Sequence, residues 1–396
     1  MTSPRPAETV RRPAPSTRVR RLVLRCLAVF VGARLVTSAF LLWLTTRTTS
    51  ASEAGAHPSF AGISSAWDGA WYRRIALHGY PTTLPLDAHG QVAQNEWAFL
   101  PAYPFLVRVV SAVTGTGWEA AAVAVSLLFG GAAAVLLGLL LARRTGDRAA
   151  LFAVALFCSS PVALVLQTAY ADAMMTCLLL GVLVLVDRRR SGWAVPVVLL
   201  AAATRPGVLA VALLVVLRCW DRWRERRAEG VAGELALLAA STVGGLAWPV
   251  VVGLATGRAD AYVRTETAWR SLWTGSTDLL LFQPWFFVAQ QLFGLAGVPV
   301  LALLAVAFVV LVLRPSRRAG RVVQLWTASY AVYLLAVFMP QTSLPRLLLP
   351  MSPALAAAPV PRRRPMIVVV LGASTALQLL WLWCTYGPVK TFLTVP

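Results

Sequence analysis

Charged residues are scarce in this chain of 396 residues, and their scarcity excludes an ordinary water-soluble globular protein. Only 13% of the residues are Asp, Glu, Lys or Arg, whereas 58% are hydrophobic. Soluble domains contain about 25% charged residues, and apolar runs of about 18 or more residues are candidates for transmembrane helices. Such runs recur along the whole sequence, between short arginine-rich stretches. The composition therefore predicts an all-α polytopic membrane protein.

Acidic residues are especially few, and their shortage leaves a formal net charge of +20 from 36 basic and 16 acidic side chains. The arginines cluster in short loops between apolar runs, which is the distribution that the positive-inside rule describes. Charges in such loops set the orientation of the chain and contact anionic lipid head groups. The sequence shows no basic face with interleaved polar residues, so nucleic acid is not expected as a partner.

Cysteine and histidine are also rare, with five and three residues in the chain. No two cysteines form a C-x-x-C pair, and all of them lie in or beside apolar segments, where they act as small hydrophobic side chains. His78 and His89 lie in one loop without the spacing of metal ligands. We therefore expect no metal site, no cofactor and no required disulfide. The cysteines are Cys26, Cys158, Cys177, Cys219 and Cys384.

The apolar segments predict about eleven transmembrane helices. A tail at residues 1–21 is rich in Pro, Arg, Ser and Thr, and we expect it to be disordered and cytoplasmic. The first span is interpreted as an uncleaved signal anchor, because no A-x-A cleavage pattern follows it. One transmembrane domain is expected at residues 22–386, and an extracytoplasmic tail at residues 387–396. The predicted spans are 22–44, 120–142, 149–166, 173–186, two halves of 193–217, 235–254, 285–313, 322–339, a tenth that ends before Arg362, and 366–386.

The apolar stretch at residues 193–217 is interrupted by Thr204-Arg205-Pro206-Gly207, and it can form either a hairpin or one kinked helix. Proline and glycine at the interruption favour a turn. A single kinked helix would reverse the orientation of everything downstream and place the arginines at 314–321 outside. The positive-inside rule therefore favours the hairpin, with Arg205 at its apex. In that arrangement all arginine clusters are cytoplasmic, and two long polar loops, 45–118 and 255–284, are extracytoplasmic.

The first of these loops contains the residues best suited to chemistry, and a short interfacial helix is expected in it at residues 99–113. If the chain is helical after Trp67, then Trp67 and Trp71 share one face, and Asp68 and Tyr72 share the neighbouring face. Aromatic residues at that spacing suit the membrane interface, where they would hold the Asp68 carboxylate close to the lipid surface. Alternatively, Asp68 caps the start of the helix.

Three further ionisable residues lie near the predicted outer ends of apolar segments. An ionisable group at membrane depth is costly, so it usually faces a cavity or a partner. Asp172 and Arg205 either face such a cavity, pair with each other, or reach the interface by snorkelling. Arg346 begins the tenth span and is placed to bind an anionic head group through its guanidinium fork. Further candidates for binding the donor phosphate or the substrate are Arg73, Arg74, Glu96 and Tyr103, although Glu96 could also be a solvated loop acid.

Four motifs in chain order resemble one protein family. They are W-D-G-A-W-Y-R-R-I-A-L-H-G-Y-P with E-W-A-F-L-P-A-Y-P in the first loop, L-V-L-Q-T-A-Y-A-D-A at 164–173, A-A-A-T-R-P-G at 201–207, and S-L-P-R-L-L-L-P at 343–350. Together they resemble the PIG-V-like family, the second mannosyltransferases of glycosylphosphatidylinositol synthesis and their bacterial relatives. That family belongs to the GT-C superfamily of multi-span glycosyltransferases. Phe99-Leu100-Pro101 stands where the family often has F-F-P.

The resemblance implies a GT-C-like bundle, a polyprenyl-phosphate-mannose donor in the lipid bilayer, and a catalytic acid in the first outer loop that corresponds to Asp68. Transfer from a sugar phosphate has a built-in leaving group, so one carboxylate that activates the acceptor hydroxyl suffices. Positive groups near the departing phosphate would stabilise its charge. We therefore expect an inverting mannosyltransferase of the cell membrane, with its active site on the extracytoplasmic face. The acceptor is an undefined lipid-linked, glycan or protein hydroxyl.

A transporter or flippase of lipid-linked or small solutes is the alternative class. Such proteins are also arginine-punctuated helical bundles with charges at membrane depth, and they often contain internal repeats and discontinuous helices. The interruption at residues 204–207 is consistent with that class, but no internal repeat accompanies it. The long polar loop at residues 67–104 favours an enzyme, because transport does not account for it.

Overall fold

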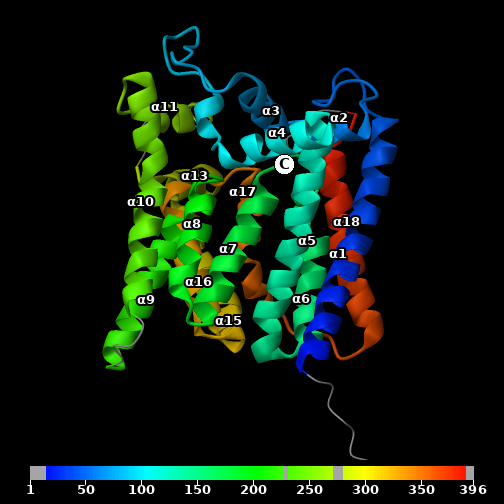
Figure 1. Cartoon of the computed structure of the whole chain (residues 1–396), viewed down its shortest axis with the longest axis vertical. Coiled ribbons are helices and arrows are strands. Elements are labelled where there is room, and N and C mark those ends of the chain that lie inside the picture. The colour runs from blue at the N-terminus through cyan, green and yellow to red at the C-terminus, as the bar shows by residue number, and fades with distance from the viewer. Residues whose placement is uncertain (1–14, 227–230, 271–279, 389–396) are drawn as a thin grey trace, which may run out of the picture.

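The computed structural model describes residues 15–226, 231–270 and 280–388 and consists of helices joined by loops, most of them short (Figure 1). It is 76% helical. Within the described ranges no strand forms, and one isolated bridge pairs Leu86 with Val92. The chain is thus an all-α polytopic membrane protein, as its composition predicts. Of the tails predicted at residues 1–21 and 387–396, residues 1–14 and 389–396 lie outside the described residues, and residues 15–21 belong to the first helix.

The helices form a bundle that carries a group of short helices at one end (Figure 1). The bundle consists of α1 (Pro15–Thr45), α5 (Trp118–Thr145), α6 (Asp147–Ser159), α7 (Asp172–Asp187), α8 (Ala194–Ala202), α9 (Leu209–Arg224), α10 (Val231–Thr256), α13 (Gln283–Phe293), α14 (Gly297–Phe308), α15 (Arg314–Ser316), α16 (Arg321–Val337) and α18 (Arg364–Tyr386). The short helices are α2 (Phe60–Ser64), α3 (Asp68–His78), α4 (Ala102–Thr114), α11 (Ala261–Ala268) and α17 (Leu344–Leu347).

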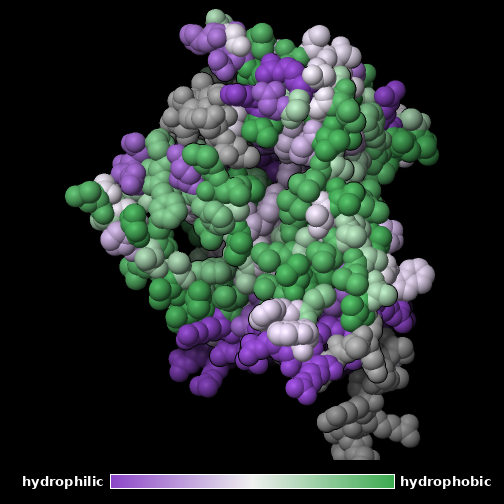
Figure 2. All heavy atoms as spheres, turned by 90° about the vertical axis from the view of Figure 1, so that its left-hand side faces the viewer, coloured by the Kyte–Doolittle hydropathy of each residue, from purple (hydrophilic) through white to green (hydrophobic). Residues whose placement is uncertain are grey.

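Five helical stretches among the described residues are long and apolar enough to cross a bilayer. A hydrocarbon core of about 30 Å requires about 20 residues at a rise of 1.5 Å each. Figure 2 shows the matching surface, an apolar belt with polar atoms gathered at both ends. The five stretches are Thr17–Thr45, Trp118–Thr145, Val231–Thr256, Gln283–Ala319 and Arg364–Tyr386.

The arginine-rich loops meet at one end of the bundle, opposite the short helices. Ion pairs join neighbouring helices there, with Arg18 at 2.8 Å from Asp147 and Arg144 at 3.1 Å from Asp187. A third pair, Arg321 with Asp221 at 2.7 Å, joins the start of α16 to the end of α9. Both long polar loops leave from the other end (Figure 1). The predicted separation of arginine clusters from polar loops is therefore present in the fold.

The stretch at residues 193–217 forms a hairpin of two antiparallel helices, α8 and α9, and contacts with α10 establish it. At the arginine-rich end, the space beside Gly233 is filled by Gly192, and Glu234 pairs with Arg218 at 2.7 Å. Half-way along α10, Gly244 faces Ala202 and its neighbour Gly245 faces Leu209. The start of α8 and the end of α9 therefore lie beside the same turn of α10, and the end of α8 and the start of α9 lie together half-way along it. The hairpin of the sequence analysis is confirmed, and its apex carries Arg205.

Several predicted boundaries are wrong, each for a local reason. The first helix begins at Pro15 instead of residue 22, because the arginines before the apolar run continue the helix. The third span ends at Ser159 instead of residue 166, since Pro161 lacks the N–H that would continue it. The tenth span is a 3₁₀ stretch at Leu349–Ala357, with Pro350 and Pro353 inside it. The short helix of the first loop is confirmed as α4, which begins after Pro101.

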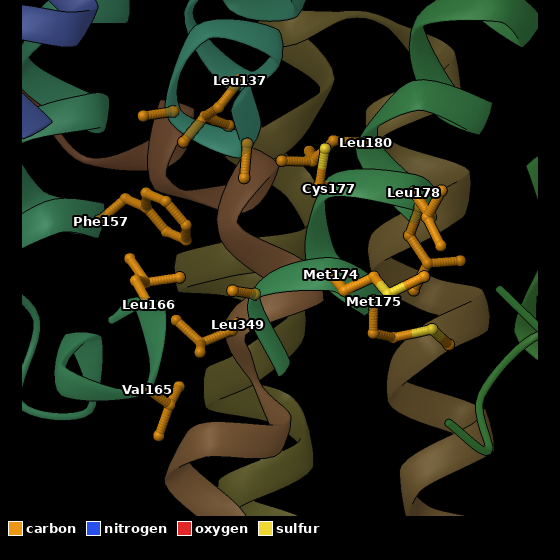
Figure 3. Close-up of a cluster of buried hydrophobic side chains, with 14 of the residues drawn as sticks. Leu137, Phe157, Val165, Leu166, Met174, Met175, Cys177, Leu178, Leu180 and Leu349 are labelled. Carbon is orange, nitrogen blue, oxygen red and sulfur yellow. The ribbon is translucent and has the colours of Figure 1, made fainter. Parts of the chain in front are cut away.

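The hydrophobic core lies between α5, α6 and α7, the most buried helices of the bundle (Figure 3). Leu137 from α5 and Phe157 from α6 contribute to the same cluster as Met174 and Cys177 from α7. Every described residue of α7 from Asp172 to Leu180 is buried. A helix that is apolar on all faces is typical of such a central position. Its buried N-terminus fixes the place of Asp172 beneath the short helices.

Candidate active site

A cavity of about 960 Å³ opens beneath the short helices, where the loops from both polar segments meet the bundle. Its wall combines apolar and aromatic side chains with a small number of charged groups, which is the usual composition of a ligand site. Six of the nine candidate residues from the sequence line it: Asp68, Tyr72, Arg74, Asp172, Arg205 and Arg346. Residues that are separated by up to 278 positions in the chain therefore share one cavity.

Asp68 reaches this cavity from the first residue of α3. The preceding residue, Trp67, has φ +59° and ψ −122°, a backbone conformation that non-glycine residues rarely adopt. Its indole Nε1 donates to the carbonyl oxygen of Thr385 at 3.3 Å, which holds the turn against α18. Trp67 is the N-cap of α3, so Asp68 does not cap the helix, and its side chain is directed to another partner. That partner is Arg346.

Asp68, Arg346, Asp172 and Arg205 form a chain of alternating charges. Nη1 of Arg346 lies 2.6 Å from Oδ2 of Asp68 and 3.9 Å from Oδ2 of Asp172. The same oxygen of Asp172 forms an ion pair with Nη1 of Arg205. All four side chains are at most 15% exposed. Buried charges are tolerated when they are paired and hydrogen-bonded, so the two acids and two guanidinium groups stabilise one another. Asp172 and Arg205 thus both pair and line the cavity.

The guanidinium group of Arg346 contacts an aromatic ring. Its guanidinium carbon lies 5.1 Å from the ring centroid of Tyr170, a distance suited to a cation–π interaction. Its Nε is buried and has no hydrogen-bond partner among the residues that the structure describes. Asp68 and the ring of Tyr170 together hold this guanidinium in the cavity wall.

The other three candidates lie outside the cavity lining. Arg73 pairs with Glu119 at 2.9 Å on the surface. Glu96 binds Arg74 at 3.3 Å, and Arg74 covers the ring of Trp71 at 4.5 Å, so Glu96 supports a residue that does line the cavity. The hydroxyl of Tyr103 is buried at 2.8 Å from Ser126 Oγ, which makes it part of the helix packing.

Trp71 stacks on Phe99 instead of standing alone at a lipid interface. The two ring centroids are 5.7 Å apart at an angle of 13°, and Trp269 from the second polar segment meets Trp71 edge-on at 5.6 Å. Trp67, Trp71 and Trp269 all line the cavity. The four-residue spacing of Trp67, the N-cap of α3, and Trp71 inside that helix therefore places both residues in a cavity wall.

An aromatic cluster joins the two polar segments above the cavity. Trp97 stacks on Tyr80 at 4.5 Å between centroids, and Trp248 of α10 lies 5.6 Å from Trp97. Nδ2 of Asn95 donates to Oγ1 of Thr265 at 3.0 Å, which adds a buried hydrogen bond between the same segments. These contacts fix the first loop to α10 and α11, so the roof of the cavity is built from both polar segments.

Solved structures similar to this chain include two of ArnT from Cupriavidus metallidurans, a GT-C glycosyltransferase. The structure bound to undecaprenyl phosphate has 17% sequence identity and a TM-score of 0.50, with 93% of this chain and 65% of ArnT covered. The apo structure has 18% identity and a TM-score of 0.47, with 89% and 63% covered. The chain has a GT-C fold. No protein-family model matches its sequence, and no curated protein matches it. The chain spans slightly less than two thirds of the length of ArnT.

Within this GT-C fold, sequence reasoning missed three charged residues of the cavity wall: Glu53, Glu266 in α11, and Arg270 just beyond α11. Burial raises the pKa of Glu266 above its ordinary value, while nearby Arg270 and Arg205 oppose the shift. Nη2 of Arg270 donates to the carbonyl oxygen of Val337 at 2.5 Å, which ties this wall to the end of α16. An acid in a polar loop gives no signal in the sequence, because solvation is its usual state.

The donor set of this GT-C fold is suited to anions and hydroxyl groups. Across the described ranges, no group of three or more His, Cys, Asp or Glu side chains is arranged to hold a metal ion. Asp68 and Asp172 in the cavity wall are instead paired with arginines, Asp68 with Arg346 and Asp172 with Arg205. Guanidinium groups bind phosphate oxygens through paired N–H donors, and carboxylates accept protons from hydroxyl groups.

Proposed function

We propose that this chain is an integral membrane glycosyltransferase that moves a sugar from a polyprenyl-phosphate donor to a hydroxyl group of an acceptor. The observation that carries the proposal is the buried alternation of Asp68, Arg346, Asp172 and Arg205 in the wall of a large cavity. It places a candidate base beside two cations in a protein whose fold is that of a GT-C glycosyltransferase. ArnT binds undecaprenyl phosphate, and a lipid phosphate of this kind suits the two guanidinium groups here.

The proposed reaction is a single displacement at the anomeric carbon. The acceptor oxygen forms a bond to that carbon, the bond from the carbon to the phosphate oxygen breaks, and Asp68 takes the acceptor proton. The electron pair of the broken bond leaves with the polyprenyl phosphate. Attack opposite the leaving group inverts the anomeric configuration. No acid is required at the phosphate, since it is already a good leaving group.

Arg346 and Arg205 are the proposed phosphate ligands. A sugar phosphodiester carries one negative charge, and the released polyprenyl phosphate carries up to two. Cations placed beside it therefore interact more strongly with the transition state than with the bound donor, which is the condition for faster chemistry. Both arginines line the cavity, so their guanidinium groups are placed to meet such a phosphate. Asp172 holds both guanidinium groups in place through its Oδ2.

Mannose is the proposed sugar, because the four sequence motifs resemble those of the PIG-V-like mannosyltransferases. The proposed side is extracytoplasmic, because the cavity lies at the end of the bundle opposite the arginine clusters and such clusters favour the cytoplasm. The proposed acceptor class is a hydroxyl of a glycan, lipid or protein at that membrane face.

The test uses the purified full chain in liposomes with labelled decaprenyl-phosphate-mannose and, in parallel, the corresponding glucose lipid. A membrane extract of the source organism serves as acceptor. We expect release of decaprenyl phosphate and appearance of label in acceptor from the mannose lipid, with the opposite anomeric configuration. Preference for the glucose lipid would refute the mannose assignment only. Movement of the intact lipid across the bilayer without cleavage would refute the enzyme and support the flippase.

A further inference from the structure

The segment between α6 and α7, residues 160–171, is an unwound stretch buried inside the bundle. It contains only one 3₁₀ turn, Ala163–Leu166, and every residue from Val162 to Ala171 is buried. Non-helical backbone at membrane depth leaves carbonyl groups without helical partners, and it is tolerated only where the protein supplies them. Each unpaired buried carbonyl costs about 1–3 kcal/mol. Neighbouring helices must therefore supply donors.

Arg34 of α1 is the main donor. Its Nη1 donates to the carbonyl oxygen of Ala163 and its Nη2 donates to that of Cys158 at 2.5 Å. The Arg34 side chain is buried in the middle of the first spanning helix. Cys158 lies at the C-terminal end of α6, where a cation is favoured by the helix dipole. From α18, Ser374 and Gln378 donate to the next carbonyls, Ser159 and Ser160, each at 2.9 Å.

The same segment contacts the residues on both sides of Asp68 and leads directly into Asp172. The N–H of Ala169 donates to the carbonyl oxygen of Ser64 at 2.8 Å, just before the turn that presents Asp68. A Cβ on Gly69 would lie 3.2 Å from Cβ of Ala169, so the start of α3 rests directly on the segment. Tyr170 then lies beneath Arg346, and Ala171 is followed at once by Asp172.

Gly130 of α5 contacts the segment at residues 160–171 from the side opposite Arg34. A Cβ at this position would lie 2.6 Å from the carbonyl oxygen of Leu166, so only glycine allows the approach. At the next residue, Gly131, an added Cβ would meet Phe30 at an ordinary 3.5 Å. The segment therefore lies between the guanidinium of Arg34 and the backbone of α5 at Gly130, and both restrict its position.

We propose that Arg34 is a positioning residue, which sets the separation of Asp68 and Asp172 by holding the unwound segment at residues 160–171. The proposal rests on the proposed glycosyl transfer for its consequence in turnover, and on the contacts above for its geometry. Arg34 acts through the segment and touches neither substrate nor the reacting atoms. The role requires the buried charge of Arg34, because charge-assisted hydrogen bonds to both carbonyls need a cation with two donors, which a neutral side chain of similar size does not provide.

The geometry is tested by a cross-link that does not depend on catalysis. Cysteines introduced by Gly69→Cys and Ala169→Cys have their Cβ atoms close to disulfide distance, about 3.5–4.5 Å. The linked peptide is quantified by mass spectrometry after brief oxidation, in the background of native Arg34, Arg34→Lys and Arg34→Met. We expect Arg34→Met to slow cross-linking by about tenfold and Arg34→Lys to restore most of the rate, since an ammonium can donate to both carbonyls. An unchanged rate in Arg34→Met overturns the proposal.

Turnover provides the second readout, measured per folded protein in the donor assay. A displacement of about 1 Å can cost about 100-fold in rate, so Arg34→Met should lower kcat by about 100-fold. The donor KM should change by less than about threefold, because Arg205 and Arg346 remain, and Arg34→Lys should recover most of kcat. Arg218→Met is the matched control, because it removes a half-buried cation at the far end of the bundle and should leave kcat unchanged. Equal kcat for Arg34→Met and native protein overturns the positioning role.

If Arg34→Met yields no folded protein, Gly130→Ala displaces the segment without removing a charge, and Gly131→Ala is its control. Slower cross-linking and lower kcat in Gly130→Ala alone support the proposal, and equal behaviour of the two variants overturns it. A native protein that transfers no sugar from any polyprenyl phosphate would refute the proposed function. The cross-linking result would still decide whether Arg34 sets the spacing of the acids.

Discussion

The replacement of Asp68 by asparagine separates the two roles that the structure gives to this residue. Asparagine keeps the size of the side chain, but it removes the negative charge and the capacity to take a proton from an acceptor hydroxyl. A general base contributes about 10²–10⁴-fold, which corresponds to about 3–5 kcal/mol of the activation barrier. We therefore expect kcat of Asp68→Asn to fall to between about one hundredth and one ten-thousandth of the native value.

The same replacement should also destabilise the fold, because Arg346 loses its closest carboxylate. Breaking a buried ion pair costs about 3–5 kcal/mol when the remaining charge is uncompensated. Here Asp172 still lies 3.9 Å from Nη1 of Arg346, so we expect a loss near the lower limit, about 3 kcal/mol. In the double variant Asp68→Asn/Arg346→Gln the unpaired cation is gone. The melting temperature should rise again in that variant, while turnover should stay low.

The measurements are initial rates per folded protein and melting temperature in one detergent. Asp260→Asn is the control, because Asp260 is an acid at the same end of the bundle whose partners Arg258 and Arg264 are exposed. It should change neither quantity. The assignment of Asp68 as the base is refuted if Asp68→Asn retains more than about a tenth of native turnover. The ion-pair reasoning is refuted if the double variant melts below the single one.

Three further predictions concern other parts of the cavity. Arg346→Ala should reduce donor use by about 10–100-fold, the value of a charged hydrogen bond, and should reduce protein yield much less; equal losses would indicate a structural role. Glu266 binds protons more tightly in the folded state, so native stability should fall as the pH rises above about 4.3, the ordinary value for Glu. Glu266→Gln should be free of that loss, and its melting-temperature advantage over native protein should grow with pH; a constant difference would contradict the assignment. Trp97→Ala should cost about 3–5 kcal/mol and speed hydrogen exchange at residues 80–98, whereas unchanged exchange would show that the aromatic cluster does not fix the loop.

The candidate residues that the sequence predicts best are charged residues in or beside apolar runs, where burying a charge costs free energy. Asp172, Arg205 and Arg346 interrupt or border apolar runs, and a charge in such a place requires a cavity or a partner. The interruption at Arg205 and the distribution of arginines together indicated the hairpin, which the contacts of α8 and α9 with α10 confirm. The same pattern of apolar spans and polar loops predicted the polytopic helical bundle, whereas the expectation of a GT-C fold came from the resemblance of the four motifs.

The residues that sequence reasoning missed are those whose environment forms only in three dimensions. Glu266 lies in a polar segment, and the charges near its buried carboxyl include Arg205, which is distant in sequence. Tyr103 belongs to an aromatic motif, yet its hydroxyl is used in packing against Ser126. Arg34 did carry a signal, a cation within the first apolar span, but its partners are backbone carbonyls, which have no sequence signature.

The short α8–α9 hairpin has a consequence for how the protein is made in the cell. With nine residues, α8 extends about 14 Å at 1.5 Å per residue, and it cannot cross a bilayer of about 30 Å. The long helices α1, α5, α10 and α18 can each insert on leaving the ribosome, whereas α8 enters only when α7 and α10 receive it. Arg205 belongs to that late group, and so does Arg346 on the four-residue helix α17. We therefore expect the cavity to be completed last, after the long helices have surrounded its place in the bundle. Arg205 and Arg346 are then paired with their acids before they can be exposed to lipid.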